Sequence, residues 1–241
     1  MTESIDLLRE QLEESRKIVF FGGAGVSTES GIPDFRSSDG LFVQESGRNV
    51  SPEEMISHTF YKRYPKSFFD YYFNNLVFED AEPNAAHLFL KELEDKGKDV
   101  SVVTQNIDGL HQKAGSSVVH ELHGTTLNNY CETCGTNYET SDLDLDTDGI
   151  PRCPKDEGIV RPDIVLYEEG LDQHTVQSAV EDIQTADLLI IAGTSLVVYP
   201  AAGLIDYFNG DHLVAINKTP LQVPARTLVF EDAISKVFKQ I

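Results

Sequence analysis

Three cysteines and an aspartate are spaced like the ligands of a metal ion. Cys131 and Cys134 form a C-x-x-C pair, and Asp156 lies three positions after Cys153, where a second pair would end. Zinc ribbons hold their metal between two such pairs, and zinc accepts a carboxylate oxygen as well as sulfur. The spacing therefore predicts a zinc ribbon in which Asp156 replaces a fourth cysteine. The alternative is a ribbon without metal that keeps its shape through packing.

A glycine-rich segment, GGAGVST at 22–28, directly follows an apolar run. Glycines allow a backbone to approach a pyrophosphate closely, and the amide groups at the start of a following helix favour its negative charge. The pattern is G-x-G-x-x-T, without the third glycine and the downstream acidic residue of a dehydrogenase fingerprint. The segment is therefore either a nucleotide-binding loop or a structural turn, and a nicotinamide dehydrogenase is disfavoured.

Two further segments place polar side chains at the carboxyl ends of apolar runs. One is TQNIDGLH at 104–111, and the other is ELHG, which carries His123. Ligands of open α/β sheets bind at these strand ends, so Gln105, Asn106 and Asp108 are candidates for binding sugar hydroxyls and an amide. A histidine at such a place can act as a general base near neutral pH. Asn106 or Asp108 could instead be an ordinary helix cap.

The order of apolar and amphipathic stretches predicts an α/β fold. Strands are expected at 17–23, 100–106, 118–124, 163–167, 187–195 and 212–217, and helices at 3–16, 84–97, 173–184 and 199–208. This alternation is typical of a Rossmann-like, doubly wound parallel sheet. Two segments interrupt it and are expected to form a small inserted domain, with a helical module at 37–80 and a zinc-ribbon-like module at 125–161. The Rossmann-like domain would then comprise 1–36, 81–124 and 162–241.

Composition narrows the class of partner. The chain has 241 residues and a net charge of −21, so it lacks the concentrated positive face that nucleic-acid binding requires. An uncharged stretch at 188–205 contains Gly193 and Pro200, which favours a buried strand and a turn over a membrane helix. The amino terminus lacks the features of an export signal, and three clustered cysteines do not suit a disulfide framework. A cytoplasmic protein with no membrane partner is expected.

Taken in order, the segments GAGVSTESGIPDFRS, TQNIDGLH, ELHG, the cysteine pairs, IVRPDIVLYEE, GTSLVVYPAA and INK resemble the sirtuin family of NAD-dependent protein lysine deacylases. The resemblance spans about residues 18 to 233 and rests on the joint order of these motifs. It implies that NAD binds in the cleft between the Rossmann-like domain and the small domain. It also implies that an acetyl group passes from acetyl-lysine to ADP-ribose while nicotinamide is released.

The resemblance also implies a role for individual residues. His123 would be the general base, with Asn106 and Asp108 beside it in the catalytic centre. The residues implied to bind NAD are Ala24, Gly25, Thr28, Phe35, Arg36, Gln105, Ile107, Asp108, Thr194, Ser195, Asn217, Asp232 and Ala233. Cys131, Cys134, Cys153 and Asp156 would bind structural zinc. The acyl-lysine peptide would lie as a strand between the two domains, against segments 165–169 and 195–198.

The chain departs from the family pattern at two positions. Asp156 stands in place of the fourth cysteine, and Glu168 stands where many members have glycine. The chain also lacks the Tyr-x-x-Arg pair with which members that prefer succinyl or malonyl groups hold a second carboxylate, so an acetyl or longer neutral acyl group is expected. Two other functions remain open, a mono-ADP-ribosyltransferase and an inactive NAD or ADP-ribose sensor.

Overall fold

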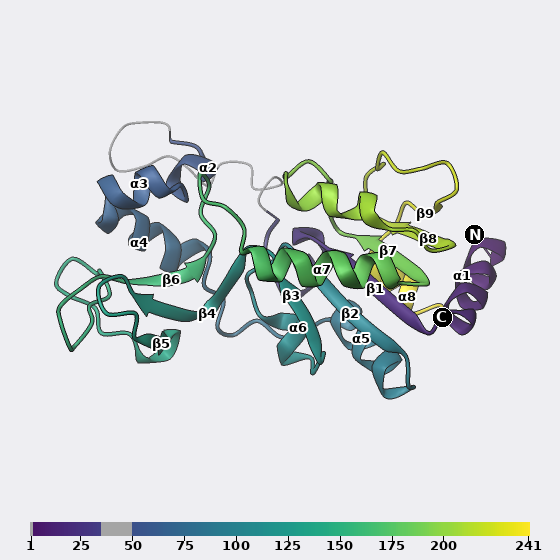
Figure 1. The fold of residues 1–241 in the computed structure, drawn as a ribbon, viewed down its shortest axis with the longest axis horizontal. Helices are drawn as coiled ribbons and strands as arrows, with labels where there is room; N and C mark the ends of the chain where they lie inside the picture. Colours follow the sequence, from purple (N-terminus) through teal and green to yellow (C-terminus); the bar gives the residue numbers. More distant parts are fainter. Residues whose placement is uncertain (1, 35–49) are drawn as a thin grey trace.

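The computed structural model describes residues 2–34 and 50–241. Its larger part is a six-stranded sheet with the strand order β3-β2-β1-β7-β8-β9 (Figure 1). Every neighbouring pair in this sheet is parallel, which confirms the doubly wound α/β fold. The strands are β1 (Lys17–Gly22), β2 (Asp99–Thr104), β3 (Val118–Glu121), β7 (Leu188–Ala192), β8 (His212–Ile216) and β9 (Leu228–Phe230).

Helices cover both faces of this sheet. One face carries α1 (Thr2–Glu14), α5 (Ala85–Asp95) and α8 (Ile234–Phe238), and the other carries α7 (Gln173–Thr185) and the 3-10 helix η4 (Ala201–Tyr207). Successive side chains of β1 alternate between the two faces, so Phe20 packs in the first hydrophobic cluster and Phe21 in the second. Burial on both faces explains why the central strands are almost continuously apolar.

The smaller part of the molecule lies at one end of the large sheet, on the left in Figure 1. It contains three short helices and a three-stranded antiparallel sheet with the order β5-β4-β6. Aromatic rings of Phe68, Phe69 and Tyr72 are fully buried between them, which accounts for the aromatic-rich sequence. The elements are α2 (Pro52–Met55), α3 (His58–Arg63), α4 (Pro65–Asn75), β4 (Gly124–Cys131), β5 (Asn137–Glu139) and β6 (Val160–Ile164).

The prediction that the run at 163–167 joins the parallel sheet is wrong. The run at 163–167 was expected in that sheet, but β6 ends at Ile164 and pairs antiparallel with β4. The chain turns away from the large sheet at Gly124, where φ is +74° and a Cβ atom would lie 2.1 Å from the Asp163 carbonyl oxygen. A short apolar run does not reveal which sheet it joins, and here β6 joins β4 through this close contact and through the pairing of 129–131 with 160–162.

The remaining elements differ in detail from expectation. The edge strand β9 was not expected, because its three residues are too short to show a period. The stretch at 199–208 forms η4, a 3-10 helix, instead of an α-helix. No helix within residues 2–34 and 50–241 is long and apolar enough to cross a bilayer.

Candidate functional site

A single row of register partners crosses all six parallel strands at their carboxyl ends. It consists of Glu121, Thr104, Gly22, Ala192, Ile216 and Phe230, in the order of the sheet. The residues that follow these partners therefore leave the sheet at one edge. The glycine-rich segment begins in this row, and Gln105, Thr194 and Asn217 follow it by one or two residues, so segments that are far apart in the sequence come together.

The glycine-rich segment after β1 touches the loop after β7. The Gly25 amide donates a hydrogen bond to the Gly193 carbonyl oxygen at 2.8 Å. A Cβ atom on Gly25 would lie 2.8 Å from the Gly193 Cα atom, and one on Gly193, whose φ is +59°, would lie 2.5 Å from the Val26 nitrogen. Both positions therefore require glycine. The segment continues through two 3-10 turns, η1 (Ala24–Val26) and η2 (Thr28–Ser30), and the Thr28 hydroxyl donates to the Gly25 carbonyl at 3.0 Å.

Asn84 supports this segment from the start of α5. Its side-chain oxygen accepts from the Ala86 amide, and its Nδ2 atom donates to the Val26 carbonyl at 2.8 Å and to the Ser30 hydroxyl at 3.0 Å. Asn84 was not among the sequence candidates. An asparagine before an amphipathic stretch indicates a helix cap, but nothing in the sequence pairs it with a segment more than fifty positions away.

Asp108, Asn106 and Ser27 form a hydrogen-bonded chain. The Ser27 hydroxyl donates to Asp108 Oδ2 at 2.6 Å, and Asn106 Nδ2 donates to the Ser27 hydroxyl at 3.0 Å. Asp108 Oδ1 also accepts from the Leu110 amide at 3.0 Å, at the start of α6 (Leu110–Lys113). Asp108 therefore does bind the start of a helix and also takes part in the buried polar network. Ser27, which is 1% exposed, was not among the sequence candidates.

His123 has one ring nitrogen in a hydrogen bond, and the other has no hydrogen-bond partner among residues 2–34 and 50–241. Its Nδ1 atom lies 2.9 Å from the Gln105 carbonyl oxygen, which can only accept, so Nδ1 carries the proton and Nε2 is left as a base. Burial lowers the pKa of His123 below its ordinary value, and the hydrogen bond to Gln105 partly opposes this shift. The imidazole is therefore neutral and able to accept a proton near pH 7.

A cavity of about 330 Å³ joins these residues to the small domain. Six of the candidates for catalysis and NAD binding line it, namely Ala24, Gln105, Asn106, Ile107, Asp108 and His123. Its other walls include Pro52, Ile56 and Tyr71 of the helical module, and the segments 164–169 and 198–200. The cavity lies between the two domains, at the strand ends where open α/β sheets bind ligands.

The other NAD candidates that the structure describes do not line this cavity. Gly25, Thr28, Thr194 and Ser195 lie in the adjoining loops, and Gln105 Nε2 donates to the Thr194 hydroxyl at 3.2 Å. Asn217 follows β8, and its side chain donates to Thr219. Asp232 and Ala233 follow β9, and Asp232 accepts from the Ala233 amide and from Lys236. Phe35 and Arg36 lie outside the described residues.

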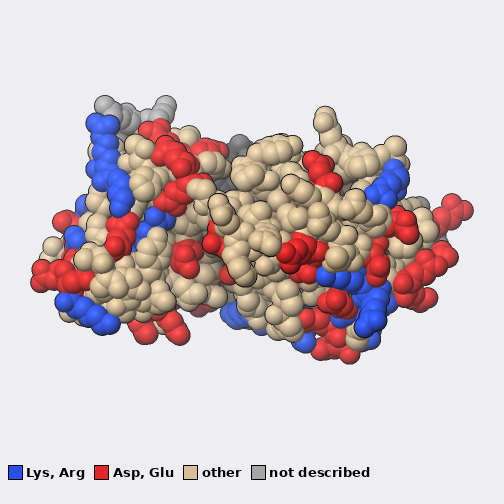
Figure 2. Space-filling view, viewed as in Figure 1, with Lys and Arg blue, Asp and Glu red and all other residues tan. Residues whose placement is uncertain are grey.

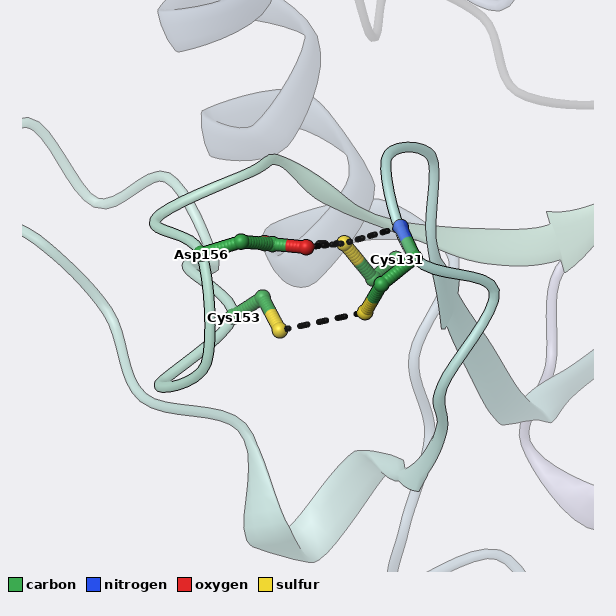
Figure 3. A group of neighbouring side chains, drawn as sticks. Cys131, Cys153 and Asp156 are labelled. Atoms are coloured by element: carbon green, nitrogen blue, oxygen red, sulfur yellow. Dashed lines mark hydrogen bonds between the residues drawn. The ribbon is translucent and has the colours of Figure 1, made fainter.

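The predicted metal ligands meet in the small domain (Figure 3). One ligand atom from each of Cys131, Cys134, Cys153 and Asp156 lies within 4.8 Å of the others. The sulfurs of Cys134 and Cys153 are 3.7 Å apart, and Cys131 Sγ is 3.4 Å from Asp156 Oδ1. Tetrahedral zinc would hold two sulfurs about 3.8 Å apart, and a sulfur and an oxygen about 3.5 Å apart. The four side chains therefore fit a zinc ion.

Outer contacts hold this donor set in place. The amides of Thr133 and Cys134 point to Cys131 Sγ at 3.3 and 3.5 Å, as expected around a thiolate ligand. The Gly158 amide donates to Asp156 Oδ1 at 2.9 Å. A Cβ atom on Gly158 would lie 3.0 Å from Cys131 Sγ and 2.9 Å from Asp156 Oδ1. A side chain at this position would therefore displace two of the four ligand side chains.

Comparisons with known proteins agree with this arrangement. The model of the Sir2 family matches residues 23–200. The NAD-dependent protein deacetylase of Clostridium perfringens is 52% identical over 100% of this chain and 99% of that protein, and the one of Staphylococcus aureus strain Mu50 is 44% identical over 98% of both. A solved structure of a Sir2 variant with deacetylated p53 peptide and 3'-O-acetyl ADP-ribose has a TM-score of 0.86 at 34% identity, covering 98% of this chain and 96% of that one.

Proposed function

The chain belongs to the Sir2 family and is an NAD-dependent protein deacetylase, and we propose that His123 is the general base of its reaction. NAD supplies the ribose that accepts the acetyl group, with loss of nicotinamide. The observation that supports His123 is its hydrogen bond to the Gln105 carbonyl. This bond holds the proton on Nδ1, so Nε2 of this cavity-lining histidine would be the neutral base for a ribose hydroxyl.

Asn106 and Asp108 would complete the catalytic centre. The chain from Asn106 through Ser27 to Asp108 fixes both side chains with hydrogen bonds of 2.6 to 3.0 Å. Groups fixed in this way bind a ribose and a carboxamide without reorganising during the reaction. Packing of the small domain over the cavity would exclude water, which favours transfer to the ribose over hydrolysis.

The remaining NAD contacts are proposed from the edge of the sheet at which these residues lie and from the sequence resemblance. Ala24 and Gly25 would lie against the NAD phosphates in the glycine-rich segment, as the sequence resemblance implies. Thr28, Phe35, Arg36, Gln105, Ile107, Thr194, Ser195, Asn217, Asp232 and Ala233 would contact other parts of NAD. Their support is the common edge of the sheet from which they extend, except for Phe35 and Arg36, which rest on the sequence resemblance.

The acyl-lysine substrate would bind as a strand between segments 165–169 and 195–198. Both segments contribute residues to the same cavity as His123, and the Val165 amide donates to the His123 carbonyl at 2.9 Å. Main-chain pairing of this kind binds peptides with little sequence preference. A solved structure of Sir2 bound to acetylated peptide has a TM-score of 0.86 with this chain. Protein substrates in the cytoplasm, and neither nucleic acid nor membrane, are the proposed partners.

Zinc is the proposed occupant of the four-ligand site, with Asp156 as its fourth ligand. Zinc would stabilise the β4–β6 sheet by joining the two loops that carry the ligands. Purified protein is expected to contain about one zinc per chain by elemental analysis. Asp156→Ala should lose most of the metal and Asp156→Cys should retain it. Equal zinc content in the wild type and Asp156→Ala would show that Asp156 is not a ligand.

The function is tested by incubating the protein with an acetyl-lysine peptide, with and without NAD. Mass spectrometry should show loss of the acetyl group matched by nicotinamide release, only when NAD is present. His123→Ala should lower this rate at least about 100-fold while NAD affinity changes little. The control is His174→Ala, since His174 is exposed on α7 and is not among the residues that line the cavity. An unimpaired His123→Ala enzyme would refute the assignment of the base.

The same experiment separates the two alternatives. Transfer of ADP-ribose to protein with the acetyl group retained would indicate a mono-ADP-ribosyltransferase. NAD binding without any turnover would indicate a sensor. The ordered Asp108, Ser27 and Asn106 network beside a neutral His123 supports the deacetylase over both.

A further inference from the structure

The cavity is lined with negative charge. Four carboxylates contribute to its wall, from Asp34, Asp108, Glu168 and Glu169, and none of the lining residues that the structure describes is lysine or arginine. Acidic side chains also gather over α2, beside the cavity (Figure 2), where Glu53 and Glu54 are exposed. The described lining residues therefore include acidic and no basic side chains, which favours a cationic side chain on a peptide bound there.

Glu169 and Asp108 are already engaged in the fold. Arg161 donates to both oxygens of Glu169 at 2.8 and 3.0 Å, and His58 Nδ1 lies 2.8 Å from Glu169 Oε1. Asp108 accepts from Ser27 and from the Leu110 amide. These two carboxylates therefore stabilise the walls of the cavity. Both already accept hydrogen bonds from groups within the protein.

Glu168 differs because only one of its oxygens is engaged. Oε2 accepts from the Thr59 amide at 2.9 Å and from the Thr59 hydroxyl at 2.6 Å. Oε1 has no hydrogen-bond partner among residues 2–34 and 50–241, and no lysine or arginine there forms an ion pair with Glu168. The two bonds from Thr59 lower the pKa of Glu168, so the group is ionised at neutral pH. The result is a fixed, exposed carboxylate with a free acceptor oxygen.

The backbone at Glu168 also departs from the usual region. Its φ is +75°, a conformation that favours glycine over residues with a Cβ atom. A glutamate at this position costs free energy that a glycine would not, and its bonds to Thr59 offset part of that cost. Packing alone would not require a carboxylate here, since the side chain is exposed.

We propose that Glu168 selects substrates that carry a lysine or arginine beside the acetyl-lysine. This inference rests on the proposed binding of the peptide strand against segment 165–169. Glu168 lies within that segment and on the cavity wall, so a cationic side chain on the bound strand can reach Oε1. A charge-assisted hydrogen bond to an oxygen that is already fixed forms at low entropic cost.

The test uses acetyl-lysine peptides that differ only in having lysine, glutamine or glutamate at one of the positions flanking the acetyl-lysine. For the wild type, kcat/KM should favour lysine over glutamine roughly threefold to fivefold at low salt, mainly through KM. Raising the salt concentration should shrink this ratio. Glu168→Gln keeps the size of the side chain and its acceptor for Thr59 but should remove the preference. Glu168→Lys should reverse it in favour of glutamate.

The matched control is Glu10→Gln, which removes the same charge from an exposed position on α1, a helix at the opposite end of the molecule from the small domain (Figure 1) and without a residue in the cavity wall. It should keep the preference of the wild type. Equal lysine-to-glutamine ratios in the wild type and Glu168→Gln would overturn the inference while leaving the deacetylase intact. Peptide affinities measured without NAD keep the two proposals separate. A lysine preference in binding that depends on Glu168 supports the inference even without turnover, whereas absence of deacetylation from every peptide refutes the proposed function.

Discussion

Two buried histidines make the protein sensitive to mild acid. His87 on α5 and His111 on α6 are 0% and 1% exposed, and their ring centroids are 4.6 Å apart. Burial lowers the pKa of His87 to about 4 and that of His111 to about 3. Asp108 partly opposes the shift at His87, and His87 adds to the shift at His111. The Asn84 amide donates to His87 Nδ1, and Phe20 packs 5.9 Å from the ring of His111.

The sign of the effect follows from where protons bind. In the unfolded chain both histidines have a pKa near 6.5, so they take up protons between pH 7 and pH 5 while the folded protein keeps them neutral. Their contribution to stability is complete above pH 6.5 and is lost as the pH falls toward 4. Between pH 7 and pH 5 the unfolded state gains about 2 kcal/mol for each histidine, or about 4 kcal/mol for the pair.

Urea unfolding at pH 7 and pH 5 measures this loss. The variants His87→Gln and His111→Leu should each make the drop in unfolding free energy between the two pH values about 2 kcal/mol smaller than in the wild type. The exposed His174→Gln is the control and should leave the drop unchanged. Comparing drops within each variant cancels any effect of the substitution that is independent of pH. Identical drops in the wild type and both buried variants would refute the reasoning.

Gly193→Ala and Arg161→Met, each with its own comparison variant, test two contacts close to the site. Gly193→Ala should lower the free energy of unfolding, measured by thermal unfolding, by about 3 kcal/mol. The reason is that a Cβ atom would lie 2.5 Å from the Val26 nitrogen at a φ of +59°. Gly31→Ala, at a φ of +84° with open space around it, should cost only about 1 kcal/mol, and equal costs would contradict the role of the close contact. Arg161→Met should cost about 3 kcal/mol, because it leaves the Glu169 carboxylate without its main partner. The double variant Arg161→Met with Glu169→Gln should recover part of this loss, and no recovery would argue against the ion pair as the cause.

The sequence by itself determined the class of fold and the position of the site along the chain. The central strands are apolar on both faces because helices cover both sides of the sheet, and that pattern is visible without coordinates. The glycine-rich segment, the polar residues at 105–108 and His123 stand directly after such runs. The C-x-x-C and C-x-x-D spacing predicted which four side chains meet in the small domain, because the geometry of each pair is local to its loop.

Only the tertiary structure decided which segments meet. Strand β6 pairs with β4 and not with the parallel sheet, because the chain turns away from that sheet at Gly124. The apolar sequence of a strand does not indicate which strand it pairs with. Ser27 and Asn84 gained their roles by contacting Asp108 and Val26, which are distant in sequence. The same holds for Glu168, whose open oxygen depends on Thr59 and not on its own neighbours. Local patterns encode the periodicity and caps of each element, whereas contacts between distant side chains appear only once the chain has folded.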